Sequence, residues 1–113
     1  MRTYRIHPAA AGWDGIMKEK QIERDIINAL TIVGFDVVKL SQPQRAMMTP
    51  GVPDLYIRHM AWQLKIWIEV KTKTGKLSLH QKVWHEVERA AGGIVLVARS
   101  AKDAVDQIAE LRT

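Results

Sequence analysis

Three residues in the middle of the chain, Asp54, Glu69 and Lys71, have the types and the spacing of a group that handles a cation and an anion together. Side chains alternate between the two faces of a β-strand, so a strand over residues 66–71 presents Glu69 and Lys71 on one face. If the chain turns back near Ala61 or Trp62, residue 54 lies opposite residues 69–70 on the paired strand. The two carboxylates then meet at one end of a sheet.

The chemistry open to this group is hydrolysis of a phosphodiester. Two carboxylates a few ångströms apart repel each other unless a cation lies between them, and divalent ions accept such oxygen ligands. The lysine would position an attacking water and offset charge developing on the phosphate, while the metal lowers the pKa of its bound water. The alternative is a surface ion pair on a strand, which contributes at most about 1 kcal/mol. Pro53 directly before Asp54, and the hairpin spacing, favour the site.

Hydrophobic periodicity predicts a mixed α/β domain around these residues. Apolar residues recur at helical spacing before Gly34, which is placed to end that helix. A capping-box motif at Ser78 and Gln81, and a cap at Ser100, begin two further helices. The expected elements are helix 16–33, strand 35–40, loop 41–53, strand 54–58, strand 64–71, helix 78–91, strand 94–98 and a last helix from residue 101.

The order α-β-β-β-α-β-α favours one mixed sheet flanked by helices, an α/β fold of the α+β kind. Residues 1–15 contain Pro8, several alanines and two glycines. We expect them to form an N-terminal extension with little regular structure, which leaves residues 16–113 as a single domain.

The residues around the candidate group also form an ordered set of motifs. These are Gly51-Val52-Pro53-Asp54-Leu55, Ile68-Glu69-Val70-Lys71-Thr72, Gly75-Lys76-Leu77-Ser78 and Gln81. In this order and spacing they closely resemble the PD-(D/E)XK nuclease superfamily and, within it, the VRR-NUC family. The similarity runs from about Glu19 to the last helix.

The resemblance implies a restriction-endonuclease-like α-β-β-β-α-β core and a DNA nuclease that depends on Mg²⁺ or Mn²⁺. It implies Asp54 and Glu69 as metal ligands, the backbone carbonyl of Val70 as a further ligand, and Lys71 as the catalytic lysine. Gln81 matches a glutamine that such families place beside the active site. Its position in a capping box would explain it equally well.

The family also has an acid on its first helix, and Glu23 is the favoured candidate for this further catalytic residue and metal ligand. The segment Glu23-Arg24-Asp25-Ile26, followed by Gly34-Phe35, is similar to that of archaeal Holliday junction resolvases. Glu23 shares a helical stripe with Ile27 and Leu30, where a carboxylate bordering the core requires a reason. Glu19, on a neighbouring apolar stripe, is the competing candidate.

The charge balance favours an anionic partner, since the net charge is +5 and the pI is near 9.7. From Lys39 to Lys82, both included, there are eight Lys or Arg residues and only two acids. We expect DNA phosphate contacts from the basic residues that flank the candidate group: Arg45, Lys73, Lys76 and Lys82. The alternative is a solvated basic face.

The histidines and tryptophans indicate no second site. His80 and His85 are five residues apart, which does not suit a helix-borne zinc site, and all four histidines are interpreted as surface or DNA-proximal groups. Trp67 shares the face of Glu69 and Lys71, so we expect it to support the site or to contact DNA.

Several classes of protein are disfavoured by what the sequence lacks. There is no cysteine for disulfides or thiolate metal sites, and no glycine-rich phosphate loop for a nucleotide cofactor. No apolar run approaches the roughly 20 residues that span a membrane, and no signal peptide is evident, so an intracellular location is expected.

These observations predict a metal-dependent DNA endonuclease. The resemblance to junction resolvases suggests branched or junction DNA as the substrate, cut by a homodimer, because one small domain makes paired cuts most simply by dimerising. The alternative is a non-catalytic DNA-binding or architectural protein that keeps the nuclease fold. Metal-dependent cleavage distinguishes the two.

Overall fold

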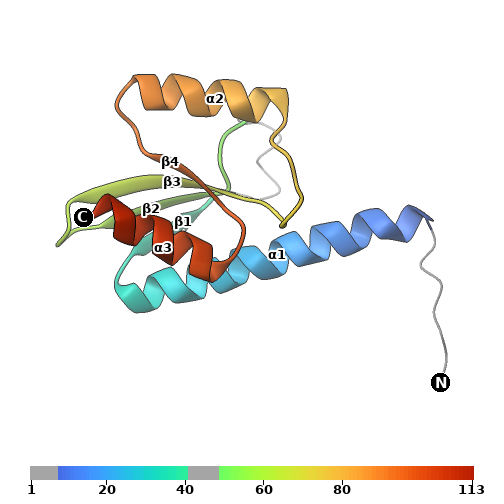
Figure 1. Cartoon of the computed structure of the whole chain (residues 1–113), viewed down its shortest axis with the longest axis horizontal. Helices are drawn as coiled ribbons and strands as arrows, with labels where there is room; N and C mark the ends of the chain where they lie inside the picture. The colour runs from blue at the N-terminus through green and yellow to red at the C-terminus, as the bar shows by residue number, and fades with distance from the viewer. Residues whose placement is uncertain (1–7, 41–48) are drawn as a thin grey trace.

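The computed structural model describes residues 8–40 and 49–113, which form three helices and four strands (Figure 1). The order α-β-β-β-α-β-α agrees with the expected order, and the strand bounds agree within one or two residues. The elements are α1 (Pro8–Val33), β1 (Asp36–Lys39), β2 (Leu55–His59), β3 (Leu64–Val70), α2 (Leu79–Ala90), β4 (Val95–Ala98) and α3 (Ala101–Leu111).

The strands form one mixed sheet in the order β1-β2-β3-β4. The first three strands are antiparallel, with Leu55 of β2 opposite Ile68 of β3. β4 runs parallel to β3, because the chain returns through α2 before it enters the sheet again. The mixed α+β fold expected from the sequence is therefore confirmed.

The first helix differs from the expectation, since α1 begins at Pro8 rather than at residue 16. The prediction that residues 1–15 have little regular structure is wrong for residues 8–15, and residues 1–7 lie outside the described residues. Proline suits the first turn of a helix, where no N–H bond is lost, and the alanines at 9–11 are strong helix formers. These favourable residues outweigh the two glycines that suggested a loop.

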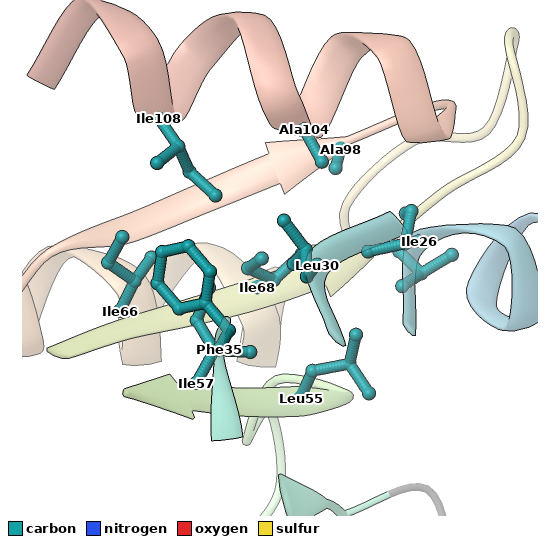
Figure 2. Packing of buried hydrophobic residues seen from close by; sticks show 11 residues of the cluster. Ile26, Leu30, Phe35, Leu55, Ile57, Ile66, Ile68, Ala98, Ala104 and Ile108 are labelled. Atoms are coloured by element: carbon teal, nitrogen blue, oxygen red, sulfur yellow. The ribbon is translucent and has the colours of Figure 1, made fainter. Parts of the chain in front are cut away.

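The helices lie on opposite faces of the sheet (Figure 1). α1 and α3 cover one face, and α2 lies alone over the other. The hydrophobic core fills the space between the sheet, α1 and α3 (Figure 2), and comprises Ile26, Leu30, Phe35, Leu55, Ile57, Ile66, Ile68, Val70, Ala98, Ala104 and Ile108. Because side chains alternate along a strand, residue 69 must point away from this core toward α2.

Local signals fix the ends of the helices around the sheet. Gly34 adopts φ +106°, a left-handed conformation that ends α1. The Ser78 side chain accepts from the Gln81 N–H, and the Gln81 side chain accepts in return from the Ser78 N–H, which completes the expected capping box of α2. Ser100 caps α3 by accepting from the Asp103 N–H.

Gly51 permits a close approach between the segment before β2 and the start of α2. It has φ +92°, and a Cβ at this position would collide with the backbone of His80. A side chain at residue 51 would therefore displace the chain that leads into Asp54.

Within the described part of the chain, no helix is long and apolar enough to span a membrane.

Replacing Ile57 by alanine tests how far this core stabilises the fold. Ile57 lies on β2, fully buried, and away from residues 69–71. We expect Ile57→Ala to lower the free energy of unfolding by about 2–5 kcal/mol, through lost transfer energy and a residual cavity. Denaturant unfolding measures the change. Met60→Ala is the control, because Met60 is 89% exposed and its loss should change stability by no more than about 0.5 kcal/mol.

Candidate active site

The β2–β3 register brings Asp54 and Glu69 together at one end of the hairpin. Leu55 pairs with Ile68, so the residue before β2 lies beside Glu69. The Val70 N–H donates to Asp54 Oδ2 at 2.8 Å, which holds the aspartate against the end of β3. Both carboxylates are buried, with Asp54 3% and Glu69 1% exposed. Burying two acids side by side is costly unless positive charge or hydrogen bonds offset it.

Helix α2 covers Glu69 with a histidine that the sequence interpretation did not assign to the site. His85 is 1% exposed, and its Nε2 lies 3.5 Å from Glu69 Oε1. The prediction that all four histidines are surface or DNA-proximal groups is therefore wrong for His85, which is buried. The spacing between histidines does not reveal this position. His85 follows Gln81 by four residues, and this i, i+4 relation places both side chains on the same face of the helix.

The surroundings of His85 favour a neutral imidazole. Burial lowers its pKa, and the positive charges of Arg89 and Lys71 lower it further. A neutral imidazole carries one N–H, so it can donate to the Glu69 carboxylate from Nε2 and accept at Nδ1. At 3.5 Å the contact between Nε2 and Glu69 Oε1 is not a hydrogen bond, but a neutral His85 has one N–H to offer beside this buried acid.

Trp67 has the supporting role that its position on the strand suggested. Its Nε1–H donates to Glu88 Oε1 at 3.1 Å, and its ring meets Trp84 edge to face at a centroid distance of 5.0 Å. Trp84 and Glu88 both belong to α2. These contacts fasten α2 to β3 two residues before Glu69, and so set the distance between the helix and the acid.

The first-helix acid lies at the border of the core, as expected. Glu23 is 7% exposed, whereas Glu19 is half-buried, so burial favours Glu23 of the two candidates. Its Oε1 forms an ion pair with Lys39 Nζ at 3.2 Å. Lys39 pairs with Leu55 in the sheet, which places Glu23 near the end of the sheet that carries Asp54.

Lys71 begins a turn that is held by an arginine, another residue missed in the sequence. Arg99 Nη1 donates to the carbonyls of Thr72 at 2.6 Å and Gly75 at 2.7 Å, and lies 3.4 Å from that of Lys73. The Lys71 N–H donates to the Ala98 carbonyl. Lys71 is thus fixed between β4 and an ordered turn. No local pattern marks Arg99, because its partners lie more than 20 residues away.

The remaining predicted residues are placed as follows. Gln81 has the capping role, and its active-site role stays a prediction. Lys73, Lys76 and Lys82 are exposed, as phosphate-contacting residues must be, and Lys73 and Lys76 belong to the turn that Arg99 organises. Arg45 lies outside the described residues.

The donor set at this end of the sheet suits a hard divalent cation. Asp54 and Glu69 offer carboxylate oxygens, and the carbonyl of Val70 lies between Glu69 and Lys71 in the chain. Among the residues that the structure describes, no three His, Asp or Glu side chains are grouped as a metal cluster. Mg²⁺ and Mn²⁺ suit sites of this type, because Mg²⁺ keeps several waters and binds through one or two carboxylates. Asp54, Glu69 and the Val70 carbonyl therefore fit Mg²⁺ or Mn²⁺, and the assignment of Glu23 as a further ligand stays a prediction.

One solved structure, titled "VRR_NUC domain", is similar to this chain. The two share 29% sequence identity with a TM-score of 0.67, and the match covers 82% of this chain and 95% of that one. No family model and no curated protein matches the chain. The likeness spans most of both chains, so it extends well beyond the β2–β3 hairpin.

Replacing Arg99 by leucine tests whether it orders the turn after Lys71. Its hydrogen bonds to carbonyls are charge-assisted and partly buried, so we expect a loss of about 1.5–3 kcal/mol in unfolding free energy. Hydrogen exchange should become faster over residues 72–77 while the amides of β2 keep their protection. Arg112→Leu is the control, because Arg112 follows α3 and contacts the Trp62 ring instead of this turn, so residues 72–77 should stay protected. Unchanged exchange at residues 72–77 in Arg99→Leu would contradict this role.

Proposed function

We propose that the chain is a metal-dependent DNA endonuclease. Its fold and its similarity to a solved VRR_NUC domain support its assignment to the VRR-NUC family. The observation that carries this proposal is the pairing of Asp54 and Glu69, both buried, with Lys71 directly after the last residue of β3. Acids are rarely buried together without a function. A VRR_NUC-like domain suggests nuclease activity, and the basic turn suggests DNA as the substrate.

Each residue has a role that its position supports. Asp54, Glu69 and the Val70 carbonyl would hold the cation, with Glu23 as the outer acid. When bound, the metal supplies Lewis acidity and a water of lowered pKa. Lys71 orients the attacking water and offsets the negative charge that develops on the phosphate. The water oxygen forms a bond to phosphorus as the water gives up a proton, and the bond from phosphorus to one sugar oxygen breaks. The leaving sugar oxygen takes up a proton from solvent, so the products are a phosphate monoester and a hydroxyl.

The resemblance to junction resolvases extends the proposal to branched or junction DNA, cut by a homodimer. Exposed Lys73 and Lys76 beside the site would contact the phosphates that flank the scissile bond. A non-catalytic DNA-binding protein would gain nothing from placing two carboxylates close to bound phosphate. The buried acids therefore favour the enzyme over the architectural alternative.

Cleavage of a supercoiled plasmid and of a four-way junction tests the proposal directly. We expect cutting with Mg²⁺ or Mn²⁺ and none with a chelator. Glu69→Gln and Lys71→Met should each lower the rate by about 100-fold or more, since each removes charge that acts on the transition state. Lys65→Met is the matched control, because Lys65 is an exposed lysine at the other end of β3. Wild-type protein that binds junctions but never cuts them would support the architectural alternative.

His85 adds a positioning residue to this scheme, since it contacts Glu69 rather than any reacting atom. A glutamine at this position carries its amide nitrogen about as far from the backbone as Nε2, whereas an asparagine reaches only as far as Nδ1. We expect His85→Gln to keep Mn²⁺ affinity close to that of the wild type. His85→Asn and His85→Leu should weaken it by about 10- to 100-fold, the usual effect of losing a group that orients a metal ligand.

Calorimetric titration of each His85 variant with Mn²⁺, without DNA, measures this effect separately from cleavage. Thermal unfolding of the same samples shows whether a variant has lost the fold instead. Equal Mn²⁺ affinity in His85→Leu and the wild type, or equal losses in the Gln and Leu variants, would contradict the positioning role.

A further inference from the structure

Helix α2 presents its apolar side to solvent, which is the reverse of the usual arrangement. Leu79, Val83 and Val87 are 75%, 52% and 64% exposed. Their spacing of four residues places them in one continuous stripe, which we call the α2 stripe. The side that faces the sheet carries His85 and Glu88, together with Trp84 and Gln81.

Such a stripe indicates a surface that contacts something apolar. Single exposed apolar residues are common, but a helix normally buries its apolar stripe. α2 lies alone on its face of the sheet (Figure 1). Within the described residues, the side chains of the α2 stripe are exposed to solvent. Three exposed apolar side chains in one stripe, rather than scattered singly, are the kind of feature that marks an interaction site. DNA does not fit, because phosphates gain nothing from leucine and valine side chains.

The charges beside the α2 stripe favour a second copy of this chain. Lys82 and Glu86 are exposed and, four residues apart, lie along the same edge of the stripe. When two such helices pair in antiparallel fashion about a twofold axis at Val83, Leu79 of one copy faces Val87 of the other. The same arrangement brings Lys82 of each copy beside Glu86 of the second copy. Apolar and charged groups are therefore complementary at once.

We propose that the α2 stripe is a homodimer interface, in which two α2 helices pair antiparallel about Val83. The proposal names the surface for the homodimer of the proposed function, although the association itself does not require nuclease activity. One helix pair buries less than the roughly 800 Å² per partner of a standard interface. The dimer is therefore expected to dissociate at low protein concentration. Each copy has one candidate active site, on the side of α2 that faces its own sheet and therefore on the side opposite the dimer interface.

A single engineered cysteine tests the geometry, because the chain has no cysteine of its own. Val83→Cys places the two thiols at the twofold axis, where a disulfide needs Cβ atoms about 3.5–4.5 Å apart. Mild oxidation of the folded protein should convert most of it to a covalent dimer. Met60→Cys and Ile32→Cys are controls, because these positions are 89% and 86% exposed but lie away from α2. Cross-linking of Val83→Cys no faster than the controls would overturn the proposal.

Charge reversal tests the predicted pairing with a rescue. Lys82→Glu places two acids opposite each other in the dimer, and Glu86→Lys places two lysines, so each should weaken association by about 3- to 10-fold in sedimentation velocity. The double variant restores opposite charges and should recover wild-type association. Failure of the double variant to recover, or a wild type that stays monomeric at concentrations of about 100 µM, would contradict the interface. Sedimentation of a monomeric wild type with anionic lipid vesicles would assign the stripe to a membrane surface instead and likewise overturn it.

These outcomes separate the interface from the proposed function. A monomer that cuts DNA refutes the interface and leaves the endonuclease standing. A dimer that cross-links through residue 83 but binds no metal and cuts no DNA supports the interface and refutes the endonuclease.

Discussion

The register of the β2–β3 hairpin is the constraint on which the candidate site depends. Leu55 pairs with Ile68, and the Val70 N–H donates to the carboxylate of Asp54. Because side chains alternate, a slip of one residue would turn Glu69 into the core and Ile68 toward α2. Burial of the apolar side chains on the opposite face makes that slip costly. The core therefore stabilises the same register that places the two acids together.

The elements that follow β3 extend this constraint to Lys71. The lysine follows the last residue of β3, its N–H donates to Ala98 of β4, and Arg99 then gathers the carbonyls of the next turn. A parallel strand requires a long crossover, and here the crossover is α2, which carries His85 back over Glu69. One connection thus supplies both the strand that fixes Lys71 and the helix that covers Glu69.

The sequence predicted what local patterns and alternation determine. Gly34, the capping box at Ser78 and the alternation around Glu69 each act over a few residues, so the element order and the facing of the two acids followed from them. Contacts across long separations have no such local signal. Arg99 meets carbonyls 24 to 27 residues earlier, and His85 meets an acid on another element. α1 begins earlier than Gly12 and Gly15 suggested, because the three alanines before them favour helix and a helix tolerates isolated glycines.

The unusual orientation of α2 follows from the site that it covers. A helix over two buried carboxylates must offer polar side chains inward, because a leucine against Glu69 would leave the charge without a compensating donor. His85 and Glu88 meet this requirement by facing Glu69 and Trp67. The inward positions of this twelve-residue helix are therefore largely polar. Its aliphatic side chains, Leu79, Val83 and Val87, point outward to solvent. Trp84 alone gives α2 little apolar contact with the sheet, so a helix so turned gains stability when its outer stripe is covered by another molecule.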